Sequence, residues 1–159
     1  MESSNRVTHY LDSQKITYNL VSHPHSKSSL GSAIGASIPL HQLAKAVILE
    51  DHEGRSMMAI LPADHKVRIK KLNETLNRNF KLVKEAKIYQ MFTDCDAGAV
   101  PPIPSAYHMD AIYEDELASE PVVFLECGDH ETLIRLSRTN FLEIMASYKH
   151  GEFSERVFH

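Results

Sequence analysis

The chain has 159 residues, 43% of them hydrophobic, which is enough for a single globular domain with a substantial core. Its longest apolar runs, such as residues 46–49, are too short to span a bilayer, and no signal-peptide pattern follows the polar residues 1–6. We therefore expect a cytoplasmic location and no membrane contact. A net charge of −4 argues against indiscriminate binding of nucleic acid, and two cysteines are too few to indicate a disulfide framework.

Positive charge is concentrated between residues 66 and 87. This stretch has eight basic residues against two acidic ones, Glu74 and Glu85, so it is locally +6 while the rest of the chain is near −10. A basic run of this kind forms either a solvated helix face or a surface that faces phosphate groups. The sequence leaves both interpretations open.

Hydrophobic periodicity predicts helices and strands in the first half of the chain. In order, we expect a helix at residues 6–14, a strand at 18–21, a short helix at 30–34, and strands at 43–49 and 56–61. The last two strands flank a turn at residues 51–54, which indicates an antiparallel hairpin. Lys45 lies at the start of the first of these strands, where it is either a solvated lysine or an ammonium held in an apolar cleft.

The second half of the chain continues this mixed pattern. We expect a helix at residues 66–78, a strand at 80–83, a helix at 86–92, a strand at 108–113, a turn or single helical turn at 114–117, strands at 122–127 and 130–136, and a final helix capped by Ser137. Gly128 and Asp129 are predicted to form a tight two-residue turn, which would hold His130 at the start of the last strand.

Residues 94–104 contain three prolines, Pro101, Pro102 and Pro104, shortly after Gly98. Proline fixes φ and lacks an N–H, so this segment is predicted to be a stiff loop rather than a helix or a central strand. A glycine at its mouth lets a ligand approach the backbone closely, and a rigid loop loses little entropy on binding. A purely structural turn is the alternative.

The two hairpins favour antiparallel pairing over repeated βαβ units. We therefore predict an α+β fold, with a single domain at residues 1–150 built on a curved, mixed, mostly antiparallel sheet with surrounding helices, and a polar tail at 151–159. Dinucleotide and phosphate fingerprints are absent, and no strong zinc pattern is present, so we expect no cofactor and no metal.

Three features occur in a characteristic order. Lys45 opens an apolar strand, residues 98–102 fit a G-x-x-x-P pattern, and Gly128 and His130 form a G-x-H element. In this order and at these separations, the chain resembles the YbaK/prolyl-tRNA-synthetase-associated editing domain family of free-standing aminoacyl-tRNA deacylases. The resemblance extends over about residues 10–148.

The resemblance implies a set of site residues. Those with a catalytic role are Lys45, Gly98 and His130, and those that bind substrate are Ala99, Val100, Pro101, Pro102 and Gly128. The chain departs from the family at Ile103 and Pro104, where Phe-Gly is common, and at Glu131, where threonine is common. These departures concern the choice of substrate more than the chemistry.

The implied chemistry suits these residue types. An aminoacyl ester is already activated, so the protein needs to orient a water, stabilise an oxyanion and exclude the correct amino acid by size. Backbone N–H groups near Gly98 can face the carbonyl, the prolines would shape the pocket, and Lys45 would contact the terminal phosphate or sugar. His130 either orients the water or the ribose, or holds the hairpin.

The leading hypothesis is a trans-editing hydrolase that deacylates tRNA mischarged with a small amino acid such as Ala, Cys or Ser, with tRNA-Pro as the expected tRNA. Small residues at Ala97 and Ala99 favour a compact pocket. The expected partners are the aminoacylated end of tRNA and an aminoacyl-tRNA synthetase, and the oligomeric state is not indicated. Two alternatives stay open: a non-catalytic tRNA- or synthetase-binding module of the same fold, and a thiol enzyme that uses Cys95 beside His108 or His130.

Overall fold

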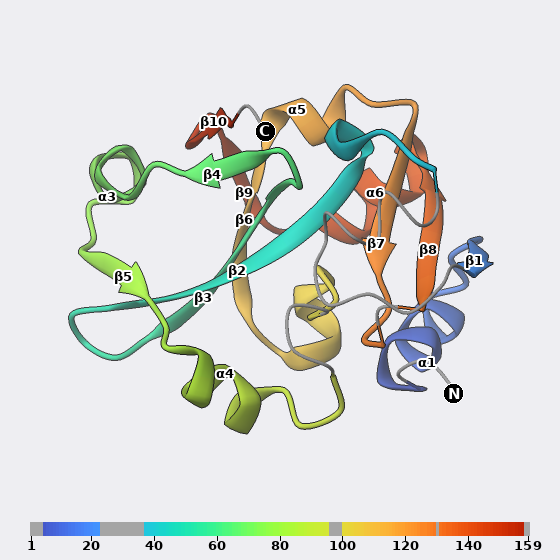
Figure 1. Cartoon of the computed structure of the whole chain (residues 1–159), viewed down its shortest axis with the longest axis horizontal. Coiled ribbons are helices and arrows are strands. Elements are labelled where there is room, and N and C mark those ends of the chain that lie inside the picture. Colours follow the sequence, from blue (N-terminus) through green and yellow to red (C-terminus); the bar gives the residue numbers. More distant parts are fainter. Residues whose placement is uncertain (1–4, 23–36, 96–99, 130, 158–159) are drawn as a thin grey trace.

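The computed structural model describes residues 5–22, 37–95, 100–129 and 131–157 (Figure 1). Its helices are α1 (Asn5–Ser13), α3 (Ile69–Leu76), α4 (Glu85–Met91), α5 (Asp115–Ala118) and α6 (Arg138–Met145), with 3-10 helices η1 (Leu40–Gln42) and η2 (Pro104–Tyr107). Its strands are β1 (Asn19–Ser22), β2 (Leu43–Asp51), β3 (Ser56–Pro62), β4 (His65–Val67), β5 (Phe80–Leu82), β6 (Asp110–Glu114), β7 (Val122–Glu126), β8 (Thr132–Ser137), β9 (Lys149–Gly151) and β10 (Ser154–Arg156).

Most of the described strands form one sheet in the order β1-β8-β7-β2-β3-β6-β9, with β5 also paired to β2. The pairs β1–β8, β7–β8, β2–β3 and β2–β5 are antiparallel, whereas β2–β7, β3–β6 and β6–β9 are parallel. Helices surround this sheet (Figure 1). The predicted α+β class, a single domain with a mixed and mostly antiparallel sheet, is confirmed.

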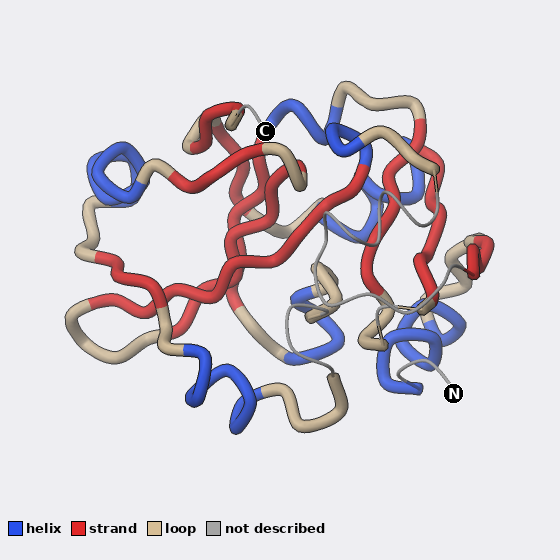
Figure 2. The backbone as a smooth tube through the Cα atoms, in the orientation of Figure 1, coloured by secondary structure: helices blue, strands red, loops and turns tan. Residues whose placement is uncertain are grey.

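Strand β2 joins the two halves of the sheet. It pairs with β3 along most of its length, as the predicted hairpin requires, and with β5 at its far end. Its contact with β7 is short, because only Leu43 and Ala44 have partners there. Beyond this contact the two strands diverge (Figure 2), so the sheet opens immediately before Lys45 in the chain.

The two faces of β2 pack against different hydrophobic clusters. Ala44 and Ile48 belong to the main core, which includes buried residues of α1, η2 and α6. Leu49 belongs to a second cluster, which includes Leu72 of α3. Because side chains alternate along a strand, Lys45 shares the face of Leu49 and not that of Ala44.

The region around residue 66 differs from the prediction. Helix α3 begins at Ile69, and the three residues before Arg68 form β4, which pairs with β10 near the end of the chain. The apolar spacing of residues 66–78 fits one helix, so only the long-range strand pairing reveals the switch. The short helix predicted at residues 30–34 lies outside the described residues.

The β7–β8 hairpin forms as predicted, but its turn is not the expected two-residue turn. The last pair before the turn is Glu126 with Leu133, and β8 begins at Thr132. A wider loop therefore joins the strands, and Gly128 adopts a φ of +115° in it, a conformation that L side chains rarely adopt. The prediction that the second strand starts at residue 130 is wrong; His130 itself lies outside the described residues.

The end of the chain packs against the domain. We expected a polar tail at residues 151–159, but Phe153 is buried in the second cluster and its carbonyl oxygen accepts a 2.8 Å hydrogen bond from the Arg68 N–H. Strand β10 follows and pairs with β4. The described part of this segment, through residue 157, therefore helps to build the small β4–β10 sheet.

Candidate functional site

Lys45 is held partly out of water. Its side chain is partly buried, and its Nζ donates a 3.5 Å hydrogen bond to the carbonyl oxygen of Ala63. Burial lowers the pKa of Lys45, and the negative charge of Asp64 offsets part of this effect. Of the two interpretations of this lysine, the structure argues against the fully solvated one, because the ammonium is partly buried and hydrogen-bonded.

Asp64 supplies the negative charge beside Lys45. It is 5% exposed, and its Oδ1 accepts no hydrogen bond from the described residues. His65 Nε2 lies 3.8 Å from Oδ1, and Arg156 Nε lies 3.4 Å from Oδ2. A buried carboxylate with so few donors costs stability. Because it lies out of water, its negative charge is weakly screened and raises the pKa of Lys45, against the larger effect of burial.

A polar network fixes the turn that contains Ala63 and Asp64. The buried His65 lies with Nε2 2.8 Å from Glu116 Oε2 and Nδ1 2.8 Å from Ser154 Oγ. Ser154 Oγ in turn donates a 2.7 Å hydrogen bond to Glu114 Oε2. Strand β10 and helix α5 thus hold β4 in place, and with it the backbone that contacts Lys45.

The proline loop is stiff and buried where it is described. Val100, Pro101 and Pro102 are buried, and the Ile103 N–H donates a 2.8 Å hydrogen bond to the Pro101 carbonyl oxygen. The expected loop therefore forms here, although Pro104 at its end begins η2. Gly98 and Ala99 lie outside the described residues.

Asp129, the middle residue of the G-x-H element, holds the described part of this element in place. Asp129 is 1% exposed, and its Oδ1 accepts hydrogen bonds from the N–H groups of Glu131, at 2.9 Å, and Thr132, at 2.8 Å. Its Oδ2 accepts a 3.3 Å hydrogen bond from Thr132 Oγ1. Asp129 therefore fixes the loop in which Gly128 lies, which gives it a structural role.

The three segments that carry the predicted site each contribute a residue to the main core. Ala44, Val100 and Cys127 belong to the same buried cluster. Ala44 precedes Lys45, Cys127 precedes Gly128, and Val100 is itself one of the predicted substrate-binding residues. The Lys45 side chain itself lies on the face of β2 opposite to Ala44, so these segments share a core, and their assembly into one site stays a prediction. The structure does not describe how the side chain of His130 relates to them.

A second buried carboxylate, Glu126, lies at the end of β7, next to the short contact between β7 and β2. The parallel pairs Leu43–Phe124 and Ala44–Leu125 place Lys45 and Glu126 at the next positions of their strands, on the same face of the sheet. Glu126 is 1% exposed. Sequence reasoning missed both Glu126 and Asp64; only Glu126 left a signal, as an acidic residue in an otherwise apolar strand.

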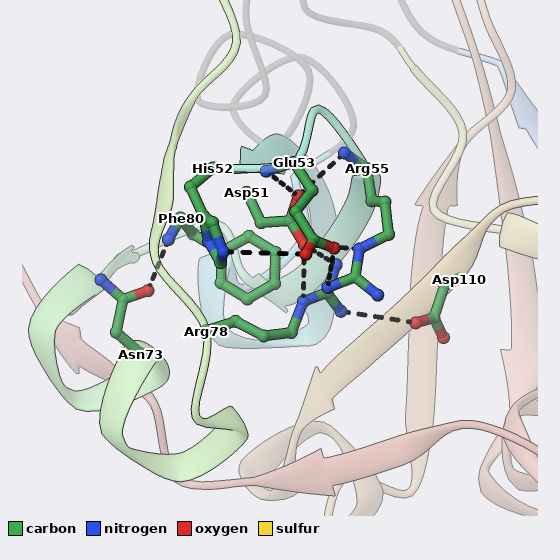
Figure 3. Close-up of polar contacts among 8 residues, drawn as sticks. All are labelled: Asp51, His52, Glu53, Arg55, Asn73, Arg78, Phe80 and Asp110. Carbon is green, nitrogen blue, oxygen red and sulfur yellow. Dashed lines mark hydrogen bonds and ion pairs between the residues drawn. The ribbon is translucent and has the colours of Figure 1, made fainter.

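Asp51, at the far end of β2, is a buried charge with many hydrogen-bond donors around it, in contrast to Lys45 (Figure 3). Asp51 Oδ1 accepts hydrogen bonds from the N–H groups of Glu53, at 3.0 Å, and Arg55, at 2.9 Å. Its Oδ2 accepts from Arg55 Nε at 2.8 Å and from Arg78 at 3.0 and 2.8 Å. Burial alone would raise the pKa of Asp51, but these hydrogen bonds outweigh it and hold the pKa well below its usual range.

Cys95 does not have the surroundings of a nucleophile. Its Sγ lies 3.1 Å from Tyr107 Oη and 3.5 Å from Asp94 Oδ1. Burial raises the pKa of this thiol to about 12, so it is protonated at neutral pH. The proposed partner His108 is exposed and adopts a φ of +54° at the end of η2. These observations argue against the thiol-enzyme hypothesis.

Two further features are absent from the described ranges. There, no group of three or more His, Cys, Asp and Glu side chains is arranged to hold a metal ion. None of the helices in that part of the chain has the length and apolar character needed to cross a membrane.

Several solved structures share this fold. The hypothetical protein APE2540 matches with a TM-score of 0.84 and 18% identity over 95% of this chain and 100% of its own. A candidate trans-editing enzyme for prolyl tRNA synthetase matches with a TM-score of 0.81 and 16% identity over 98% of both chains. A candidate signal transduction protein from Marinobacter aquaeolei VT8 matches at 0.77 and 18%, over 96% of this chain and 31% of its own. No curated protein matched the sequence.

The family comparison is more specific than these structural likenesses. The model of the aminoacyl-tRNA editing domain matches residues 23–144, which is more than half of the chain. This range includes Lys45, the proline loop and the G-x-H element. The chain therefore belongs to the aminoacyl-tRNA editing domain family, as its resemblance to the YbaK proteins predicted.

Proposed function

We propose that this chain is a trans-editing hydrolase that removes a small amino acid, such as alanine, cysteine or serine, from mischarged tRNA-Pro. The observation that carries the proposal is the partly buried Lys45, held by the Ala63 carbonyl beside the buried Asp64, in a chain of the editing family. The likeness to a candidate trans-editing enzyme for prolyl tRNA synthetase supports the choice of tRNA and suggests that synthetase as a partner.

The proposed reaction is hydrolysis of the ester that joins the amino acid to the terminal ribose. Water adds to the ester carbonyl carbon, the bond to the ribose oxygen breaks, and that oxygen takes up the proton, so that the free amino acid and the tRNA leave. The N–H groups of Gly98 and Ala99 are the proposed donors to the developing oxyanion. His130 is proposed to orient the water or the ribose.

Lys45 is proposed to act as a positive charge rather than as a base. A compact ammonium suits contact with the terminal phosphate or the sugar hydroxyls, and partial burial strengthens that contact. Because its pKa is lowered, the positive form is lost at a lower pH than for an exposed lysine. Activity that needs this charge should therefore fall on the alkaline side of the pH profile.

The proline loop is proposed to set the size of the pocket. Pro101 and Pro102 are buried and have no N–H to donate, so they can contribute shape but no hydrogen bond. The neighbouring Val100 and Ile103 pack into the main core, which would keep this wall rigid. A rigid wall can exclude a larger amino acid, which is how an editing site spares the correct product.

The test is a deacylation panel with the purified chain. tRNA-Pro charged with labelled alanine, cysteine, serine or proline is incubated with the protein, and loss of label is compared with spontaneous hydrolysis in its absence. We expect release of at least one small amino acid and no release of proline. Inertness on every small aminoacyl-tRNA would overturn the proposal, and tight tRNA binding without release would identify a non-catalytic module.

A further inference from the structure

One face of the small β4–β10 sheet and the start of α3 carries a basic groove. The basic residues that line it are Lys66, Arg68, Lys70 and Lys71, together with two acidic ones, Glu74 and Glu155. Val67 and Ile69 alternate with the first three and pack against the second hydrophobic cluster. Their burial turns Lys66, Arg68 and Lys70 toward solvent, where all three are exposed.

Most of the basic side chains in this groove form no ion pair with the described residues. Further along the basic stretch, Lys81 and Lys87 pair with Glu50, and Arg78 pairs with Asp51. In the groove, only Lys66 has an ion pair, at 3.3 Å to Glu155, and both side chains of that pair are largely exposed. Among the described residues, Arg68, Lys70 and Lys71 form no side-chain ion pair.

The location of the groove connects it to Lys45. Ala63, whose carbonyl holds Lys45, precedes Lys66 by three residues, so at most about 10 Å of extended chain separates them. The eight residues of α3 add about 12 Å. The groove thus lies within about 22 Å of the backbone that contacts Lys45, close enough for one tRNA to reach both.

The chemistry of the groove favours a polyanion with regularly spaced charges. Lysine and arginine side chains without internal partners can neutralise phosphates and release the counterions bound to them. The apolar side chains that line the groove are the partly buried Val67 and Ile69, and the large exposed ones of the described residues, Leu20, Leu82 and Tyr89, do not line it. The groove therefore presents mainly charge, unlike the wide apolar face of a membrane-binding surface. In a chain of net charge −4, a local positive surface also orients an approaching polyanion.

We propose that this β4–α3 groove binds the phosphate backbone of the double-helical part of the tRNA, next to the aminoacylated end held at Lys45. The identity of the polyanion rests on the proposed function, whereas the location of the contact rests on the groove itself. The groove positions the tRNA and takes no part in breaking the ester.

The experiment compares two double variants with equal loss of charge. Lys70→Gln/Lys71→Gln removes two groove charges, and Lys15→Gln/Lys149→Gln removes two exposed charges elsewhere that have no ion pair among the described residues. Binding of uncharged tRNA is followed by fluorescence anisotropy over a range of salt concentrations. For the groove variant only, we expect the dissociation constant for tRNA to rise about tenfold. The slope of log binding constant against log salt concentration should become less steep, by the equivalent of between one and two released counterions.

Kinetics distinguish a failure of the groove from a failure of the proposed function. With mischarged tRNA, the groove variant should show a raised KM and an unchanged kcat, whereas with an aminoacylated CCA fragment without duplex it should match the wild type. A groove variant that binds tRNA as tightly as the wild type, with the same salt dependence, overturns the groove proposal even if the chain is an active deacylase. If tRNA binds through the groove but no ester is hydrolysed, the proposed function fails and the groove stands.

Discussion

The two ends of β2 each carry a charge, and their surroundings are opposite. Asp51 at the end of the strand accepts hydrogen bonds from two backbone N–H groups and two guanidinium groups. Lys45 near the start donates, among the described residues, a single 3.5 Å hydrogen bond to the Ala63 carbonyl oxygen. The pKa of Asp51 is shifted so as to favour its charge, whereas burial shifts the pKa of Lys45 against its charge.

The difference separates a structural charge from a candidate functional one. The hydrogen bonds of Asp51 close the turn after β2 and connect the hairpin to Arg78, whose guanidinium also lies 4.4 Å over the ring of Phe80. Among the described residues nothing comparable holds Lys45, so its ammonium keeps donors there to offer to a ligand. We therefore expect substitutions at the two ends to affect different measurements.

The largest expected effect is on catalysis, at Lys45. Lys45→Met keeps an apolar stem and removes the charge, so kcat/KM for small aminoacyl-tRNA should fall by about 100-fold or more. The melting temperature should stay the same or rise, because a charge held partly out of water is removed. Lys15→Met, at an exposed lysine, is the control. Full activity of Lys45→Met would remove this residue from the mechanism.

The next effect is on stability, at Asp51. Asp51→Asn should lower the melting temperature by several degrees, because a neutral amide cannot satisfy the donors of Arg55 and Arg78. The activity of the folded protein at 25 °C should stay within about twofold of the wild type. Since the pKa of Asp51 is depressed in the folded state, its contribution is complete above the unfolded pKa of about 4 and is lost as the pH falls further.

Thermal melts at several pH values check this assignment. The difference in melting temperature between wild type and Asp51→Asn should be greatest near neutral pH and should shrink in acid. A difference that stays constant from neutral pH into strong acid would show that the charge of Asp51 does not carry the effect.

A smaller effect is expected at Asp64, on the pH profile. The charge of Asp64 raises the pKa of Lys45, so Asp64→Asn should move the alkaline fall in single-turnover deacylation to lower pH. Spontaneous ester hydrolysis is subtracted at each pH. Arg156→Gln, which leaves the Asp64 charge in place, is the control. An unmoved alkaline limb in Asp64→Asn would show that this carboxylate does not act on the catalytic step through Lys45.

The smallest effect is expected at Cys95. Because burial raises the pKa of its thiol to about 12, we expect Cys95→Ser to retain deacylation within about twofold. Iodoacetamide at neutral pH should likewise leave the wild-type activity intact over the time of the assay. Loss of activity in Cys95→Ser, with an unchanged melting temperature, would revive the thiol-enzyme hypothesis.

Much of the fold could be predicted because its signals are local. The β2–β3 hairpin followed from two apolar runs around a glycine turn, and Ser137 does cap α6, since its side chain accepts a 3.2 Å hydrogen bond from the Asn140 N–H. The β7–β8 turn was predicted too short. A Gly-Asp pair is typical of a two-residue turn, and the sequence does not show that the Asp129 carboxylate closes a wider loop instead.

The site residues named from the sequence stay a prediction, and the charges around Lys45 were not foreseen. Lys45 and the proline loop were found from their residue types and order in the chain. Asp64 was missed because its proximity to Lys45 depends on the turn between β3 and β4, which in turn depends on the pairing of β4 with β10. The basic stretch was noticed, but sequence could not separate its internally paired members from those that line the groove.

The sequence by itself determined most of the secondary elements, the fold class and the family, because hydrophobic periodicity, proline geometry and motif order are local properties of the chain. It did not reveal β4 and β10, which depend on pairing with each other. Only the tertiary structure decided which charges on those elements are satisfied. The pairing of β2 with β7 ends at Ala44, immediately before Lys45, and at the other end of β2 Arg78 donates a hydrogen bond to Asp51. Both arrangements depend on residues that are far apart in sequence. Long-range contacts set burial and hydrogen bonding, and these are what distinguish a charge that holds the fold from one available to a substrate.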